Sequence, residues 1–265
     1  MKLKITHTSH YAYDAPVSYG LQQARLTPVT SAQQTVLNWT VAVDGGAPEL
    51  TFTDQYDNAT TLIQATAGTS DIAVTVSGEV ETHCTDGVFG MVYGVAPLWH
   101  FLQDTPRTAI GKGIQKLGKA LAKSDDTLTG LHVLSQTIAD AVPYGQAATY
   151  ASTPAEDALR AGGGVCQDHA QIFIAAARYA GIPARYISGY LMMNDRIDQD
   201  ASHAWAEAHI DGLGWVGFDV SNGICPDERY VRIAVGRDSR DASPITGMRM
   251  GHGAESLTVS LQVQQ

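Results

Sequence analysis

Cys166 is the residue of this sequence best placed for nucleophilic chemistry. It follows a run of three glycines, 162–164, and stands where a helix is predicted to begin. A helix N-terminus offers unpaired N–H groups and a partial positive charge, both of which favour a thiolate. Glycines let a substrate backbone approach closely, and the backbone N–H of Cys166 is then available to bind an oxyanion. A buried cysteine acting as a small apolar side chain is the alternative, and the glycine run alone does not separate the two.

A cysteine nucleophile needs a general base, and the base needs a third group that orients it. His203 begins an alternating, strand-like segment, and Asp219 lies near the end of the next such segment, after the turn at Asp211-Gly212. If the two segments form an antiparallel hairpin, His203 and Asp219 lie close together. Asp219 would then fix the imidazole tautomer while the other ring nitrogen faces Cys166. Each residue alone is typical of an ordinary strand, so their pairing across the hairpin carries the prediction.

Composition limits the class of protein that these residues belong to. The chain has 265 residues, of which 44% are hydrophobic and 17% charged, which is typical of a globular protein with one large domain or two smaller ones. The formal net charge is −10, and no Lys/Arg cluster stands out in the sequence. We therefore expect neither nucleic acid nor an anionic membrane surface as a partner.

Cysteine usage and the N-terminus bear on the cellular compartment. Cys84, Cys166 and Cys225 are too few, and odd in number, for a disulfide framework, which fits a reducing compartment. The first residues lack the apolar stretch of a signal peptide, and no run of about 18 apolar residues is present. These patterns predict a cytoplasmic protein.

Two structural regions position the candidate residues. Residues 1–95 alternate with a period of two and contain turn chemistry at 54–58, which predicts a β-sandwich-like module. Residues 96–265 are predicted to form an α+β core, with helices packed on an antiparallel sheet. Strands of the first region are expected from Leu3 and at 36–43, 60–65 and 72–80. In the second, two helices are expected within 108–142, a third after Thr153-Pro154-Ala155-Glu156 (a predicted capping box) and a fourth over 166–180, with strands at 185–191, 203–210, 214–220, 230–235 and 257–263.

Several ordered motifs resemble bacterial transglutaminase-like proteins, which are similar to papain-type cysteine proteases in site chemistry. The motifs are Gly164-Val165-Cys166-Gln167-Asp168, the segment 180–190 (AGIPARYISGY), His203-Ala204-Trp205-Ala206-Glu207, and Gly214-Trp215-Val216-Gly217-Phe218-Asp219. Residues 1–95 resemble the β-rich N-terminal region of the same proteins. The resemblance implies a papain-like, transglutaminase-like core with Cys166 as nucleophile, His203 as base and Asp219 as the orienting group.

Two positions depart from the pattern of these proteins. Val220-Ser221 follows the aspartate where a Pro-Thr pair is frequent, and His169 stands where an aromatic or apolar residue is usual. The three triad positions are intact, so neither change removes the chemistry. His169 is expected at a packing or surface position of its helix, although it would alter the electrostatics of the site if it faced the cleft.

The residues around the triad carry further expectations. Tyr144 and Tyr150 are candidates to line the cleft or to donate to an oxyanion, and the loops 144–152 and 192–202 are expected to shape it. Trp205 and Trp215 are expected either to exclude water from the site or to pack in the core. Asp168 and Arg185 are interpreted as structural, Arg185 as an ion-pair partner.

The predicted activity is thiol-dependent acyl transfer on an amide or peptide substrate through a thioester. Hydrolysis, as in a cysteine peptidase or amidase, is favoured over transglutaminase-type cross-linking, and no cofactor or metal is expected because no calcium-loop pattern is present. One alternative is a zinc site built from Cys166, His169, His203 and His209. Another is a non-catalytic binding module that retains the fold. The sequence identifies neither the substrate nor the oligomeric state.

Overall fold

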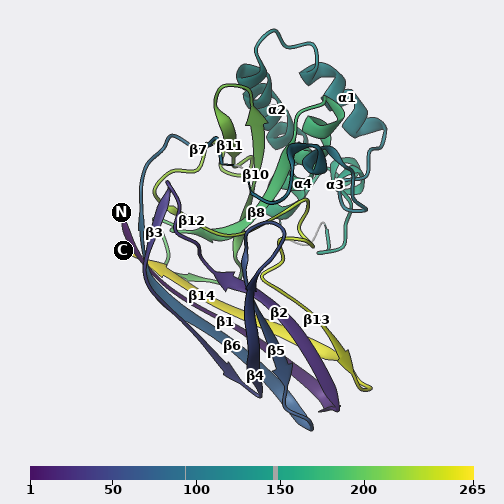
Figure 1. Ribbon diagram of the computed structural model, residues 1–265. Helices are drawn as coiled ribbons and strands as arrows, with labels where there is room; N and C mark the ends of the chain where they lie inside the picture. The colour runs from purple at the N-terminus through teal and green to yellow at the C-terminus, as the bar shows by residue number, and fades with distance from the viewer. Residues whose placement is uncertain (93, 146–148) are drawn as a thin grey trace.

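The computed structural model describes residues 1–92, 94–145 and 149–265 (Figure 1). The helices are α1 (Lys112–Leu121), α2 (Thr127–Ala141), α3 (Ala155–Ala161) and α4 (Cys166–Tyr179), with a 3-10 helix at Leu98–Leu102. The strands are β1 (Lys2–Val17), β2 (Tyr19–Thr27), β3 (Gln34–Asp44), β4 (Gly46–Thr53), β5 (Ala59–Ala65), β6 (Thr69–Thr82), β7 (Val88–Gly90), β8 (Ala184–Leu191), β9 (Asp198–Gln199), β10 (His203–Ile210), β11 (Gly214–Phe218), β12 (Tyr230–Gly236), β13 (Ile245–Met250) and β14 (Glu255–Gln264). The α+β class predicted from the sequence is confirmed.

The N-terminal strands form two packed sheets, with the strand orders β3-β6-β1-β14-β9 and β13-β2-β5-β4. Alternate residues of β1 are buried, as its period of two requires. An apolar cluster that includes Tyr11, Leu26, Ile63 and Val74 draws its side chains from both sheets. Long strands that cover a shared core explain the sandwich-like shape below the helices in Figure 1.

The last strands of the chain return to this sandwich. β14 pairs with β1 from Lys4↔Gln264 to Tyr13↔Glu255, and β13 pairs with β2. The sequence analysis assigned all of 96–265 to the C-terminal core, whereas the structure places these two strands with the N-terminal module. It also places β7, from the N-terminal stretch, in the core sheet beside β11. The periodicity of a strand reveals its faces but not its partner, and β1 without β14 would leave one edge of the sheet open.

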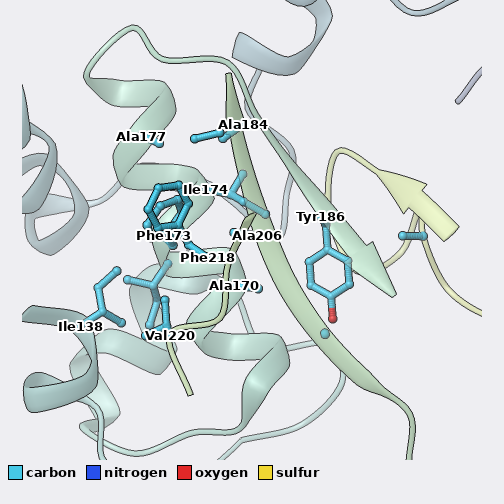
Figure 2. Close-up of a cluster of buried hydrophobic side chains, with 14 of the residues drawn as sticks. Ile138, Ala170, Phe173, Ile174, Ala177, Ala184, Tyr186, Ala206, Phe218 and Val220 are labelled. Atoms are coloured by element: carbon cyan, nitrogen blue, oxygen red, sulfur yellow. The ribbon is translucent and has the colours of Figure 1, made fainter. Parts of the chain in front are cut away.

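The C-terminal core is a sheet of order β12-β8-β10-β11-β7 with α4 packed on one face. Ala170, Phe173, Ile174 and Ala177 are all buried as expected, but so is every other residue from Asp168 to Arg178, so α4 is a core helix rather than one with a single apolar face. Figure 2 shows the cluster, in which the rings of Phe173 and Phe218 stack with centroids 4.9 Å apart. This packing fixes the start of α4 against the strands that carry His203 and Asp219.

The capping box expected at Thr153 is wrong. Pro154, which caps α3, makes no side-chain cap bond. Glu156 instead accepts hydrogen bonds from the backbone N–H groups of Gly113 (2.8 Å) and Ile114 (2.9 Å) in the first turn of α1. The cap residue of α1 is a glycine, which has no side chain to satisfy these donors, so a carboxylate from α3 supplies the acceptors.

The outer face of α1 carries a group of lysines that the sequence analysis did not recognise as a cluster. Lys112, Lys116, Lys119 and Lys123 line one shallow surface, because spacings of three and four residues share a helix face. The positive charge is therefore more concentrated than the acidic composition indicates. Among the helices in the described ranges, none has the length and apolar character needed to span a membrane.

Candidate active site

Cys166 is the first residue of α4 and lines a cleft of about 370 Å³. The preceding residue, Val165, is extended and caps the helix. Asp168, which is fully buried, accepts hydrogen bonds from the Val165 N–H (2.9 Å) and from the Thr149 hydroxyl (2.6 Å). Asp168, in the first turn of α4, thus accepts a hydrogen bond from the residue that caps the helix, which agrees with its expected structural role. The thiol is left partly exposed at the positive end of the helix.

The structure brings His203 and Asp219 together as the hairpin prediction requires. β10 and β11 pair antiparallel, and His203 Nε2 lies 2.6 Å from Asp219 Oδ2. The two side chains are almost entirely buried, with 8% and 1% of their surfaces exposed. His203 lines the same cleft as Cys166, and its interaction with that side chain helps to raise the pKa of the imidazole. Since Nε2 is taken by Asp219, the ring nitrogen on the thiol side is Nδ1.

Two residues that the sequence analysis missed complete the surroundings of Asp219. The Asn222 side-chain amide and the Tyr230 hydroxyl each donate to Asp219 Oδ2 at 2.7 Å. The Asn222 backbone N–H donates to Oδ1 at 3.3 Å. An asparagine three residues after an aspartate is a turn signal visible in the sequence. Tyr230 lies on β12, which is separated from β11 by β8 and β10 in the sheet order, and no local pattern points to it.

These contacts set the charge state of the pair. Burial raises the pKa of Asp219, but the hydrogen bonds from His203, Asn222 and Tyr230 outweigh burial and lower it overall. Burial likewise opposes a charge on His203, yet its bonds to Asp219 and Cys166 raise its pKa above the ordinary value. Burial and the Asp219 charge raise the pKa of Tyr230, so that its hydroxyl remains a donor. The arrangement favours an imidazolium held between a carboxylate and a thiol, and such a neighbour stabilises thiolates.

The other residues expected at the site divide into two groups. Tyr144 lines the cleft together with Met193, Arg196 and the segment 199–202, so the described parts of both predicted loops contribute, whereas 146–148 lie outside the described residues. Tyr150 is 83% exposed and does not line the cleft. Trp205 and Trp215 are buried in a cluster on the sheet face opposite α4. The Trp205 ring stacks behind His203 with centroids 6.4 Å apart, so Trp205 supports the base rather than shielding the thiol.

The four residues of the zinc alternative do not converge. His169 is buried, and its ring nitrogens bond to the Val142 carbonyl (2.7 Å) and to the Ser221 hydroxyl (2.8 Å). His209 lies against Trp215, toward the far end of β10. In the part of the chain that the structure describes, no three His, Cys, Asp or Glu side chains are grouped to hold a metal ion. The two departures from the family pattern, His169 and Ser221, contact each other and join α4 to the turn after Asp219.

Comparison with known proteins agrees with this geometry. Residues 115–220, which contain Cys166, His203 and Asp219, match the model of the transglutaminase-like superfamily. The chain carries a transglutaminase-like core. Residues 3–81 match the bacterial transglutaminase-like N-terminal region. The resemblance seen in the motifs is therefore confirmed over both parts of the chain.

Similar proteins match over nearly the full length of the chain. A solved structure of a "putative cysteine protease" from Cytophaga hutchinsonii superposes with a TM-score of 0.79 at 25% identity, covering 100% of this chain and 90% of that one. An uncharacterized protein of Mycobacterium leprae is 28% identical, with 99% of this chain and 98% of the relative covered. One from Mycobacterium tuberculosis is also 28% identical, with 99% and 92% covered. Together with the transglutaminase-like core, the solved relative supports a thiol-dependent activity.

Proposed function

We propose that the protein is a cysteine peptidase or amidase in which Cys166 is the nucleophile, His203 the base and Asp219 the group that orients the base. The observation that carries this proposal is the alignment of the three residues. His203 is bonded through Nε2 to a buried carboxylate at 2.6 Å and lines the same cleft as Cys166. A role in binding alone does not require this alignment inside an open cleft.

The proposed reaction proceeds through a thioester. The Cys166 thiolate attacks the amide carbonyl carbon, and the resulting oxyanion is bound by the Cys166 backbone N–H at the start of α4. The intermediate collapses, and the departing amine takes the proton of the His203 imidazolium. Neutral His203 then accepts a proton from water as the water attacks the thioester. Release of the acid restores the thiolate and the imidazolium.

Water is the proposed acceptor because the cleft does little to exclude it. Polar side chains such as Gln167, Ser188 and Ser202 line the walls, and the thiol is partly exposed. Neither of the tryptophans near the site covers Cys166, since both are buried behind the sheet. A transferase must protect its thioester from water long enough for an amine to attack. Transfer to a lysine amine, as in cross-linking, is the alternative that the product analysis below distinguishes.

The first test compares the reactivity of two cysteines in one molecule. Cys84 is exposed, whereas Cys166 is half-buried, so exposure alone favours alkylation of Cys84. If His203 activates Cys166, iodoacetamide at pH 6 modifies Cys166 first, as measured by peptide mass spectrometry. An inert Cys166, or one that reacts like Cys84, would favour the non-catalytic binding module instead.

The second test identifies the product. The wild type is incubated with casein and a fluorescent primary amine, and both new peptide termini and incorporated amine are measured. We expect new termini without incorporation in the wild type, no new termini in Cys166→Ala, and full activity in the matched control Cys225→Ala. Incorporation that exceeds cleavage would establish cross-linking, and undiminished turnover by Cys166→Ala would sink the assignment of the nucleophile.

A further inference from the structure

A second cavity lies behind the catalytic sheet. Its volume is about 240 Å³, and it is bounded by the sheet and by the N-terminal segments 29–34 and 55–58. Alternation along β8 separates it from the Cys166 cleft, because Tyr186 and Ser188 line the cleft while Arg185 lines the second cavity. No described residue lines both cavities, so they are two different sites.

The buried charged groups at this cavity carry one more positive charge than negative charges. Arg185 Nε donates to Glu207 Oε2 at 2.7 Å, and Arg232 Nη1 donates to the other oxygen of the same carboxylate. Two guanidinium groups thus share one buried carboxylate. Burial lowers the pKa of Arg185 to about 10, which still leaves it protonated at neutral pH. Asp57 also lines the cavity, and its charge acts on Arg185, but it is exposed, so water screens it more than the buried charges.

Arg185 has a donor without a protein partner. The residue is 7% exposed, and within the described ranges its buried Nη2 finds no hydrogen-bond acceptor. The buried Arg178 provides the contrast: its Nε, Nη1 and Nη2 all donate, and most of the acceptors are backbone carbonyls. A buried donor left unpaired costs about 1–3 kcal/mol, and more when the group is charged. Arg178 is fully paired within the protein, whereas the Arg185 guanidinium, which lines the cavity, is paired only in part.

The walls of the cavity add an apolar surface beside the charge. The Arg185 guanidinium lies 3.8 Å from the centre of the Trp215 ring, and that of Arg232 lies 4.3 Å from the centre of the Phe89 ring. Leu98 and Phe101 line the same space. The volume is roughly eight times what one water occupies in the liquid, and it falls below the about 300–1,000 Å³ of sites for drug-sized ligands. A molecule with one ring fits this size, whereas a peptide segment does not.

We propose that this cavity binds a small organic carboxylate, whose acid group lies against the guanidinium groups of Arg185 and Arg232 and whose apolar part lies against Trp215 and Phe89. A carboxylate carries one negative charge, which matches the single excess positive charge of the Arg185–Glu207–Arg232 group. The guanidinium fork is suited to carboxylate geometry. The proposal is independent of the chemistry at Cys166, because the two sites have separate walls.

The test compares an acid with its uncharged counterpart on the intact protein. Phenylacetate and phenylacetamide are titrated while the indole N–H signals of the four tryptophans are followed by NMR, with Trp215→Phe used for assignment. We expect phenylacetate to shift the Trp215 signal and to bind at least about tenfold more tightly than phenylacetamide. No shift up to about 10 mM acid overturns the proposal. Equal binding of acid and amide, or shifts confined to residues of the Cys166 cleft, also overturns it.

A pair of variants locates the charge that matters. Arg232→Met leaves the Arg185–Glu207 pair balanced, so we expect phenylacetate to bind about tenfold more weakly while phenylacetamide is unaffected. Arg196→Gln is the matched control, because Arg196 lines the Cys166 cleft instead. If Arg232→Met fails to fold, the acid–amide comparison in the wild type still decides the question. If Arg196→Gln weakens phenylacetate binding and a folded Arg232→Met does not, the acid binds in the Cys166 cleft and the proposal is overturned.

Discussion

Replacing Asp219 with asparagine tests whether this carboxylate holds His203 in its charged form. Asp219 Oδ2 accepts from His203, Asn222 and Tyr230 at 2.6, 2.7 and 2.7 Å. An amide oxygen has two lone pairs and no charge, so it does not retain all three bonds. In the wild type the Asn222 backbone N–H donates to Asp219 Oδ1. In the variant the new amide N–H₂ faces this N–H, so two donors meet. The change removes a charge and one acceptor while nearly preserving the shape.

The magnitude follows from the bond that is weakened. A hydrogen bond to a charged group contributes about 1.5–3 kcal/mol, and one pKa unit corresponds to about 1.4 kcal/mol. We therefore expect the pKa of His203 to fall by about one to two units in Asp219→Asn. The sign is fixed by the direction of the wild-type shift. The pKa of His203 is raised on folding, so its imidazolium adds stability that is complete below the unfolded pKa and is lost as pH rises through the folded pKa. In the variant the folded pKa is lower, so the loss is complete at a lower pH and is smaller in total.

The assay follows the His203 imidazole directly. Protein labelled with ¹³C at histidine Cε1 is titrated by NMR, with His203→Gln used for assignment, and alkylation of Cys166 at pH 6 is measured in parallel. Asp211→Asn is the matched control, because it removes the same charge from the exposed turn of the same hairpin. We expect a lower midpoint and slower alkylation in Asp219→Asn only. An unchanged His203 midpoint in Asp219→Asn would refute the argument that this carboxylate sets the charge of the base.

Two further predictions concern the elements that position the site. Glu156→Gln removes the charged acceptors of two N–H groups at the start of α1, so we expect a loss of about 1–2 kcal/mol in urea unfolding; a similar loss in the exposed control Glu49→Gln would contradict the capping role. A double-mutant cycle of His169→Phe and Ser221→Ala tests the 2.8 Å bond that joins α4 to the turn after Asp219. We expect a coupling energy of about 0.5–3 kcal/mol, and strictly additive losses would show that the bond does not link the two elements.

The position of Cys166 at a helix start and the hairpin of β10 and β11 could be predicted because local signals define them. β10 has the bounds expected from its alternation, 203–210, and the following turn contains Gly212 at φ +83°, a conformation that favours glycine. The start of α4 is marked by glycines, and its end by Gly181 at φ +84°. Each signal lies within a few residues of the element that it predicts. A hairpin then places His203 beside Asp219 without any further information.

The partners that come from distant parts of the chain could not be predicted. Tyr230 reaches Asp219 from another strand of the sheet, and Glu156 serves α1 rather than its own helix. β14 joins β1 although the two strands stand at opposite ends of the sequence. The local pattern identifies Tyr230 as a strand residue, Glu156 as an acid at a helix start, and β14 as a strand. The partner depends on the packing of whole elements, which periodicity does not encode.

Arg185 shows how structure changes the meaning of a residue whose local role was predicted. An ion-pair partner was expected at this position, and Arg185 does pair with Glu207. The same carboxylate also serves Arg232, which lies 47 positions further along the chain. Only the shared acceptor reveals that two cations meet one anion, and only the cavity lining shows that both cations border the same space. The ion pair of Arg185 and Glu207 therefore becomes the basis for a ligand site, because Glu207 is shared with Arg232 from another strand of the sheet.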